Sequence, residues 1–440
     1  MVIVGLLTAW FIGSLNNNWE KQKFTDYSDD ADIYLRTATE IVDNKRFHEE
    51  DSLTVGAFRR APGYPIFLAI VFSIFGKSIL ALFVVQAFLY AISIILLWRI
   101  SGFFLQQYWR VIPSLLLACS WFVALHVTTI IPELYSLFLL LVLILTILEA
   151  QIYQKYQFLL IGGFSVSLFL LTKPMALYIV PILVFLMALT LKGGTLKNIS
   201  LFLLIPLVFV GAWTIRSYKL FDTWQIQSGS YVVGWKSLEA TKPWDRIFAS
   251  FLGGLFGDVV AERYLPGYAD NPEPYENVNI IFDQMIFLAN EGKSEKEIEK
   301  ILYTEAYNRI RAHPLQFSVA GITGLLRQNT PMNFQGQAIT HAFALKKTTP
   351  WHMSLIIFIR AVWYIFLAVV VYGLILKVYE WKTSGFVITW ILLYNFFYAF
   401  FTHNEARYLI PIWPFYLLFF VIGLQAIMKK YATRLRITLP

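Results

Sequence analysis

Three carboxylates stand close together near the start of the chain, at Asp29, Asp30 and Asp32. They follow the first apolar stretch, and the run Arg-Arg-Ala-Pro-Gly-Tyr-Pro at 59–65 comes soon after them. Charged side chains at a membrane edge are costly unless they face water or a bound partner. This cluster is therefore the first candidate site for chemistry.

Asp30 and Tyr34 are four residues apart, so they share one face of a helix that begins near Asp30. An ionised Asp30 can accept the proton of an acceptor hydroxyl, or hold that hydroxyl by a hydrogen bond while it attacks. A capping role competes with this chemistry, because Asp is among the most favoured residues at a helix N-cap. Both roles can hold at once on adjacent residues. We expect Asp30 to be catalytic, with Asp32, Tyr34 and Tyr64 contacting the substrate.

The composition indicates an integral membrane protein. Hydrophobic residues make up 58% of the chain and charged residues 15%, whereas about a quarter of the residues in soluble proteins are charged. The aromatic share of 17% suits helix ends that need amphipathic rings at the lipid headgroups. The net charge of +8 requires no nucleic-acid partner, because the cytoplasmic loops of membrane proteins carry Lys and Arg.

The apolar stretches predict an all-α fold, a polytopic bundle of about ten or eleven transmembrane helices. These stretches are 2–15, 79–100, 111–130, 132–150, 157–172, 174–191, 199–216, 353–378, 384–402 and 408–428. A further apolar stretch at 65–75 is too short to cross, so we expect a juxtamembrane helix that lies flat on the outer surface. We expect 2–15 to be a membrane helix, because it lacks the positive n-region and cleavage site of a signal peptide.

The distribution of basic residues predicts the orientation of the bundle. If 65–75 lies flat, the loops on one side include Arg110, Lys192 and Lys382 among many basic residues. The short loops on the other side then hold only Lys173 and Arg407. Because cytoplasmic loops are the basic ones, the face that bears the carboxylates is predicted to be the outer one.

Several basic residues lie at outer helix ends or in the first outer loop. They are Arg59, Arg60, Lys173, Arg216 and Arg407. A guanidinium group suits a phosphate because it offers paired donors to the phosphate oxygens. Any one of them alone is better explained by contact with lipid headgroups. Because all five share a face with Asp30 and Glu133, we expect a lipid-phosphate site in which Arg60, Lys173, Arg216 and Arg407 bind the phosphate.

Glu133 follows Pro132 at the outer start of a predicted helix, where the helix dipole stabilises a negative charge. Plain capping is the alternative to a catalytic role there. Another polar segment, from His403 to Arg407, joins two long apolar helices. His403 and Glu405 supply two types of metal ligand without a third at metal spacing. We therefore predict no metal site and no required cofactor, and we treat a divalent ion as optional.

Two long segments, 16–63 and 217–350, lie between the predicted spans. We expect an N-terminal transmembrane region at 1–216 with a catalytic first outer loop at 16–78. A large outer loop at 217–350 and C-terminal helices with a short basic tail at 351–440 complete the chain. Ser294 and Glu297 predict a capping box, and the helix that follows should run to Arg311. Its apolar stripe can lie against the membrane domain.

The chain contains no P-loop, no Gly-x-Ser-x-Gly motif and no His-Glu-x-x-His motif. An activated donor bound on a P-loop is therefore not expected.

The order of several short motifs resembles the GT-C superfamily of integral membrane glycosyltransferases, in particular the lipid A aminoarabinose transferases and the protein O-mannosyltransferases. The motifs are Asp30 to Tyr34, Arg60 to Pro65, Pro132-Glu133, Thr172-Lys173-Pro174, Trp213 to Tyr218, His313-Pro314 and Glu405 to Tyr408 with Pro411 and Pro414. The chain departs from the family pattern at Ala61, where proline is usual, and at Lys173, where Arg is common.

The resemblance implies transfer of a sugar from a polyprenyl monophosphate to an acceptor at the outer face of a bacterial-type cytoplasmic membrane, with inversion at the anomeric carbon. It places Asp30 at the catalytic carboxylate of the first loop, Glu133 at a second acidic position and Arg60 at a basic position. The implied partners are a polyprenyl-phosphate sugar, the bilayer, and a lipid, protein or glycan acceptor.

Two other functions fit part of this pattern. A transporter or flippase of lipid-linked sugars also needs a basic vestibule with carboxylates. Transporters usually show related halves and broken helices near the bilayer midplane, and this sequence shows no repeat. A polymerase or ligase that uses lipid diphosphates is the third reading, but the Asp30 motif followed by Pro-Gly-Tyr-Pro favours a monophosphate.

A thiol reagent that cannot cross the membrane tests the orientation. Applied from outside, it should label Ser294→Cys, in the predicted outer loop, and leave Lys382→Cys, in a predicted cytoplasmic loop, unlabelled. The reverse labelling pattern would contradict the assigned topology.

Overall fold

The computed structural model describes residues 1–15, 29–47, 60–154, 157–191, 195–268, 275–330, 350–402 and 405–435. Every regular element within these ranges is a helix. The expected all-α polytopic fold is therefore confirmed.

Six helices in the described ranges are long and apolar enough to cross a membrane. They are α4 (Ile79–Ser101), α7 (Glu133–Tyr153), α10 (Thr195–Phe221), α18 (Pro350–Val378), α19 (Trp381–Phe401) and the continuous pair of η6 (Ala406–Ile412) and α20 (Trp413–Leu435). A further pair of segments meets the same criterion together and is bent by 49°. It contains η2 (Gln107–Val111), α5 (Ile112–Ala118), α6 (Trp121–Ala124) and η3 (Leu125–Thr128).

The remaining apolar helices are shorter. They are α1 (Val2–Leu15), α3 (Gly63–Phe75), α8 (Phe158–Thr172) and α9 (Val180–Thr190). The shortest, α9, has 11 residues and is therefore about 16 Å long, roughly half the thickness of the hydrocarbon core. The count of ten or eleven spans stays a prediction, because it depends on these short helices.

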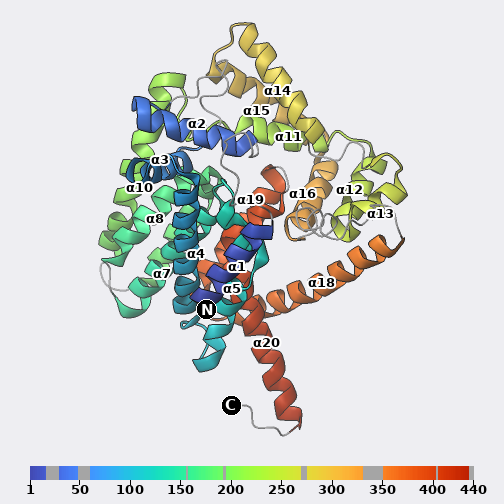
Figure 1. The fold of residues 1–440 in the computed structure, drawn as a ribbon. Coiled ribbons are helices and arrows are strands. Elements are labelled where there is room, and N and C mark those ends of the chain that lie inside the picture. The colour runs from blue at the N-terminus through green and yellow to red at the C-terminus, as the bar shows by residue number, and fades with distance from the viewer. Residues whose placement is uncertain are drawn as a thin grey trace.

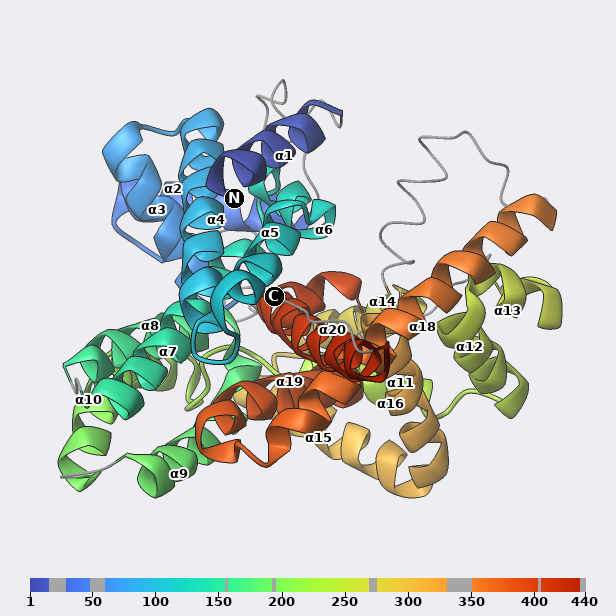
Figure 2. The same cartoon turned by 90° about the horizontal axis from the view of Figure 1, so that it is seen from below.

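Several of the apolar helices lie in a row, and α18 is inclined to them. Figure 1 shows α4, α7, α8 and α10 side by side, with α2 (Asp29–Asn44) lying across one end of this row. The C-terminal part of α20 extends from the opposite end. The view from below in Figure 2 shows α18 leaving the bundle in the direction of α12 (Trp244–Phe256) and α13 (Asp258–Tyr264).

A close contact fixes α3 over the end of α8. A Cβ atom on Gly63 would lie 2.3 Å from Oγ1 of Thr172 and 2.8 Å from its backbone nitrogen, so only glycine fits there. The helix α2 packs on α3 and buries Ala31, Leu35 and Ala38. The N-terminal turn of α2 is joined to η6 (Ala406–Ile412), which packs on α7, by the ion pair of Asp30 with Arg407. The predicted flat orientation of 65–75 in the membrane surface remains a prediction.

The segment after α10 forms a group of helices at the same end of the molecule as α2. It contains α11 (Ser230–Glu239), α14 (Tyr275–Asn290), α15 (Glu295–Ala312) and α16 (Pro314–Gln328), in addition to α12 and α13 (Figure 1). The capping box of Ser294 and Glu297 is present, and α15 ends one residue beyond the predicted Arg311. The predicted division of the chain into three regions remains a prediction.

The apolar stripe of α15 faces a different partner from the one expected. Ile298, Leu302 and Ala306 are buried, but α15 packs mainly on α11, with smaller contacts to α14 and α16. The expectation that this stripe lies against the membrane domain is therefore wrong. The reason is that α11 and α14 supply an apolar surface of their own, including Tyr231 and Ile281.

Candidate active site

An ion-pair cluster lies where the N-terminal turn of α2 meets the start of η6. Asp30 accepts hydrogen bonds from two guanidinium groups, Arg60 on Oδ1 and Arg407 on Oδ2, the latter at 3.0 Å. The side chains of Arg60 and Arg407 remain 21% and 15% exposed, so this part of the cluster reaches the surface. Three predicted site residues thus meet, although 377 positions separate Asp30 from Arg407.

Glu133 and Lys173 form the buried part of the cluster. The Nζ atom of Lys173 donates a hydrogen bond of 3.0 Å to Oε1 of Glu133. The Nε atom of Arg407 lies 3.9 Å from the same oxygen. Arg407 therefore contacts both Asp30 and Glu133, which joins five of the predicted residues into one network.

The packing of α7 explains how Glu133 and Arg407 meet. The helix α7 lies against α8, α4 and η6, and its first turn buries Leu134 and Leu137. The residues after Arg407 bury Leu409 and Ile410 in the same core. Lys173 directly follows α8, where Pro174 begins η4 (Pro174–Tyr178). The apolar sides of these segments are thus fixed by the core, and their polar ends converge.

A third carboxylate balances the charge of the cluster. Glu405 pairs with Nε of Arg407. The carboxylates of Asp30, Glu133 and Glu405 match the three cations of Arg60, Lys173 and Arg407. Charges removed from water require such pairing, because an unmatched buried charge costs several kcal/mol.

Aromatic rings line the cationic groups. The Tyr408 ring lies 5.2 Å from Nζ of Lys173 and 5.7 Å from the guanidinium carbon of Arg407. Tyr34 lies 6.0 Å from the guanidinium carbon of Arg60, so the predicted common face of Asp30 and Tyr34 is confirmed. Burial raises the pKa of the Tyr34 hydroxyl well above its usual value. This hydroxyl therefore stays protonated at neutral pH and can donate a hydrogen bond.

Tyr64 lies behind Tyr34 rather than at the surface. It is 1% exposed, and its ring meets the Tyr34 ring edge to face at 5.1 Å. Its hydroxyl lies 3.2 Å from Oε1 of Gln86. These contacts make Tyr64 a support for the position of Tyr34, and its predicted contact with substrate stays a prediction.

Two predicted residues lie apart from the cluster. Asp32 pairs with Arg36 at 3.0 Å on an exposed face of α2. Arg216 donates a hydrogen bond of 3.0 Å to the carbonyl of Phe47, and its guanidinium carbon lies 4.4 Å from the centre of the Trp213 ring. Within the described residues, the structure joins neither Asp32 nor Arg216 to Asp30 by an ion pair or hydrogen bond. Arg59 and His403 lie outside the described residues.

One carboxylate oxygen in the buried part of the cluster has its hydrogen-bonding capacity unused. Oε2 of Glu133 is buried and has no hydrogen-bond partner among the residues that the structure describes. A buried acceptor left in this state costs about 1–3 kcal/mol. The atom is therefore suited to accept a hydrogen bond or a proton from a bound molecule. In the same ranges no group of three or more His, Cys, Asp or Glu residues could hold a metal ion.

Glu405 and Tyr408 were not selected as site residues from the sequence. Both stand in the polar segment around Arg407, so their position beside a predicted site residue is the signal that marks them. Their contacts with Arg407 and Lys173 depend on how η6 turns against α7 and α8, and residue spacing alone does not give that geometry.

Part of the chain matches a known protein family. Residues 59–215 match the family described as dolichyl-phosphate-mannose-protein mannosyltransferase. A search of the curated proteins found no match.

The whole chain also has counterparts among solved structures. One is the archaeal oligosaccharyltransferase AglB from Archaeoglobus fulgidus in complex with an inhibitory peptide and a dolichol-phosphate, with 15% identity and a TM-score of 0.51. The apo form of the Archaeoglobus fulgidus oligosaccharyltransferase gives 12% identity and a TM-score of 0.53. A third structure, of the Archaeoglobus fulgidus oligosaccharyltransferase tethered to an acceptor peptide, gives 15% identity and a TM-score of 0.51. Each match covers 98% of this chain and 50% of the other, so this chain spans half the length of those proteins.

The two comparisons agree with the motifs read from the sequence. The matches to solved structures show the fold, and the family match covers the segment from Arg59 to Ile215. The resemblance to the GT-C superfamily is thereby confirmed.

The buried ion pair gives a test of the cluster. We expect Lys173→Met to lower the free energy of unfolding by about 3 kcal/mol, because it leaves the charge of Glu133 buried without its nearest partner. The double variant Lys173→Met with Glu133→Gln should recover part of this loss. Denaturant titration in mixed micelles measures both values.

Lys77→Met is the matched control, since Lys77 pairs with Asp43 on the surface. It should cost less than about 1 kcal/mol. Equal losses for Lys173→Met and Lys77→Met would show that the buried pair is not a structural element of the site.

Proposed function

We propose that the chain is a membrane glycosyltransferase that moves a sugar from a polyprenyl monophosphate to an acceptor hydroxyl, with inversion at the anomeric carbon. The observation that carries the proposal is the contact of Arg407 with both Asp30 and Glu133. This arrangement places a phosphate-binding cation between two candidate bases. The family description names a dolichyl-phosphate-mannose donor, and a solved structure of similar fold contains a dolichol-phosphate.

Arg60 and Arg407 are the residues we assign to the donor phosphate. Both are partly exposed at the surface end of the cluster. Guanidinium groups hold phosphate oxygens through paired N–H donors and stabilise the charge that develops as the phosphate leaves. Lys173 is enclosed beside Glu133. In this proposal it balances the negative charge of Glu133 and adds positive electrostatic potential at the phosphate site. Arg216 can meet the carrier only if the carrier also passes Phe47 and Trp213.

The transfer step needs one base. The oxygen of the acceptor hydroxyl attacks the anomeric carbon while the bond from that carbon to the phosphate oxygen breaks. The bonding electron pair leaves with the phosphate, and the hydroxyl proton passes to a carboxylate. An ionised carboxylate offers about four acceptor sites, so Asp30 can orient the hydroxyl in addition to its two arginine partners. Oε2 of Glu133 is the second position at which the proton can be held.

The phosphate is a good leaving group once its charge is balanced, so the step requires no separate acid. A divalent ion remains optional in this mechanism. The acceptor is a lipid, a protein or a glycan. We place the reaction at the outer face of a bacterial-type cytoplasmic membrane, and this assignment rests on the distribution of Lys and Arg among the loops.

A transporter gains no support from the site. Transporters typically bind substrate near the bilayer midplane, between related halves. Here Asp30 and Arg407 meet at the end of the bundle that carries α2 and α11 (Figure 1).

Replacement of Asp30 tests the proposed chemistry. We expect Asp30→Asn to lower kcat roughly 10²–10⁴-fold, the range for loss of a general base, and to leave the chain folded in the membrane. The measurement is sugar transfer by protein reconstituted in liposomes that contain sugar-loaded polyprenyl phosphate. Asp32→Asn is the matched control, because Asp32 lies two residues away and pairs with Arg36 outside the cluster. Transfer by Asp30→Asn at the rate of Asp32→Asn would remove Asp30 from the mechanism.

A further inference from the structure

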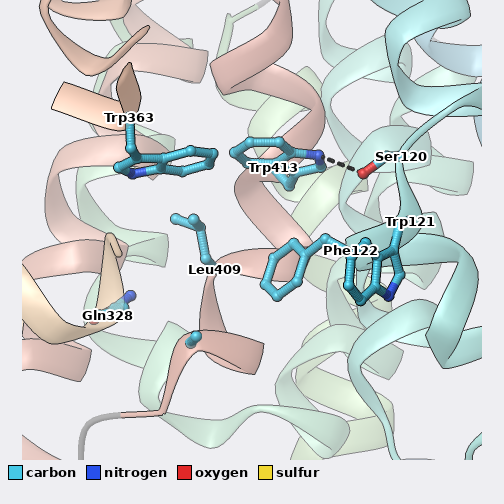
Figure 3. A pocket seen from close by; sticks show the side chains of 8 residues that line it. Ser120, Trp121, Phe122, Gln328, Trp363, Leu409 and Trp413 are labelled. Atoms are coloured by element: carbon cyan, nitrogen blue, oxygen red, sulfur yellow. Dashed lines mark hydrogen bonds between the residues drawn. The ribbon is translucent and has the colours of Figure 1, made fainter. Parts of the chain in front are cut away.

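A cavity of about 140 Å³ lies beside the ion-pair cluster. Its walls are mainly aromatic and come from α6, α18 and α20 (Figure 3). Trp363 and Trp413 are parallel within 9°, with ring centres 5.5 Å apart, and the Phe122 ring meets Trp413 edge to face at 5.9 Å. A dry cavity of about 150 Å³ accommodates a benzene molecule in another protein. The space is therefore comparable in size with a cavity that holds one small ring.

The rings of this cavity are held by hydrogen bonds. Nε1 of Trp413 donates to Oγ of Ser120 at 3.0 Å, and Nε1 of Trp363 donates to the carbonyl of Asn329. The side chain of Asn329 is in turn bonded to Asn395 and Tyr416. The shape of the cavity is thus fixed before anything binds, which lowers the entropy cost of binding.

One polar group in the wall lacks a partner. Gln328 ends α16, lines the cavity and is 1% exposed. Its Nε2 atom has no hydrogen-bond partner among the described residues. Figure 3 shows Gln328 across the cavity from Phe122 and Trp121. An acceptor on a molecule that fills the cavity would satisfy this buried amide donor.

The cavity and the ion-pair cluster share one short helix. Ala406 and Leu409 line the cavity, and Arg407 between them reaches Asp30 and Glu133. The cavity and the cluster are thus formed by neighbouring residues of η6.

We infer that this cavity binds the sugar ring of the lipid-linked donor, with the apolar face of the ring on the tryptophans and a ring hydroxyl accepting from Gln328. The inference rests on the proposed function. It makes Gln328 a residue that determines donor specificity. Aromatic walls with a few placed polar groups are the usual construction of a small-molecule site.

An isoprene unit of the carrier is the competing occupant. It would satisfy the aromatic walls, but it carries no acceptor for Nε2 of Gln328. Trp363 also borders an apolar depression on the outer side of α18, formed with Phe358, Val362 and Phe366. The carrier chain is better suited to that depression, whose lining is almost entirely apolar.

Binding of loaded and bare carrier distinguishes the two occupants. The probes are undecaprenyl phosphate and the same carrier bearing mannose, glucose, galactose or N-acetylglucosamine, with the full chain in lipid nanodiscs. We expect wild type to bind at least one loaded carrier about tenfold more tightly than bare carrier. Gln328→Met, which keeps the length and removes the amide, should abolish this preference and leave the Kd for bare carrier unchanged.

Gln284→Met is the matched control, because Gln284 lies on α14 and bonds to Glu305. It should bind every carrier like wild type. Equally tighter binding of bare and loaded carrier by Gln328→Met, whose apolar side chain suits an isoprene unit, would assign the cavity to the lipid chain, and unchanged binding of both would show that Gln328 contacts no donor. Either result overturns the inference while the proposed function stands. If wild type binds neither carrier, the proposed function fails as well.

Discussion

The site depends on one arginine that has to satisfy two carboxylates on different helices. Arg407 bonds to Asp30 of α2 and lies beside Glu133 of α7. Glu133 is buried and needs cations beside it, because burying an unpaired charge costs several kcal/mol, whereas Asp30 is 26% exposed and also pairs with Arg60. The meeting of α2, α7 and η6 is therefore an electrostatic requirement as well as a result of apolar packing.

The balance of three cations and three carboxylates has a consequence for the proposed reaction. A donor phosphate can approach Arg60 and Arg407 only by sharing them with Asp30, Glu133 and Glu405. Each new N–H contact to phosphate then weakens a contact that holds a carboxylate. On the proposed function, a phosphate that shares Arg407 leaves Asp30 with an acceptor site for the hydroxyl of the acceptor.

Local patterns in the sequence predicted the local features well. The capping box at Ser294, the end of α15 and the shared face of Asp30 and Tyr34 all follow from spacing within a helix. The sequence could not show that Asp32 pairs with Arg36, because both faces of a short amphipathic helix bear charges, and its contact with substrate stays a prediction. The sequence also could not predict the contact of Arg407 with Asp30. These residues are far apart in the chain, and their contact depends on how η6, α2 and α7 pack. The prediction that Arg216 joins the cluster rests on its side of the membrane. Two residues on the same side of a membrane can still lie far apart in the membrane plane.

The most direct measurement of the central claim is the Kd for undecaprenyl phosphate of Arg407→Lys compared with wild type. Lysine keeps a positive charge near Asp30 and Glu133 but loses the paired donors of a guanidinium group. The account predicts that Arg407→Lys binds the carrier about tenfold more weakly, while Arg36→Lys, on the exposed face of α2, binds it like wild type. Equal Kd values for Arg407→Lys and wild type would contradict the assignment of the phosphate to Arg407.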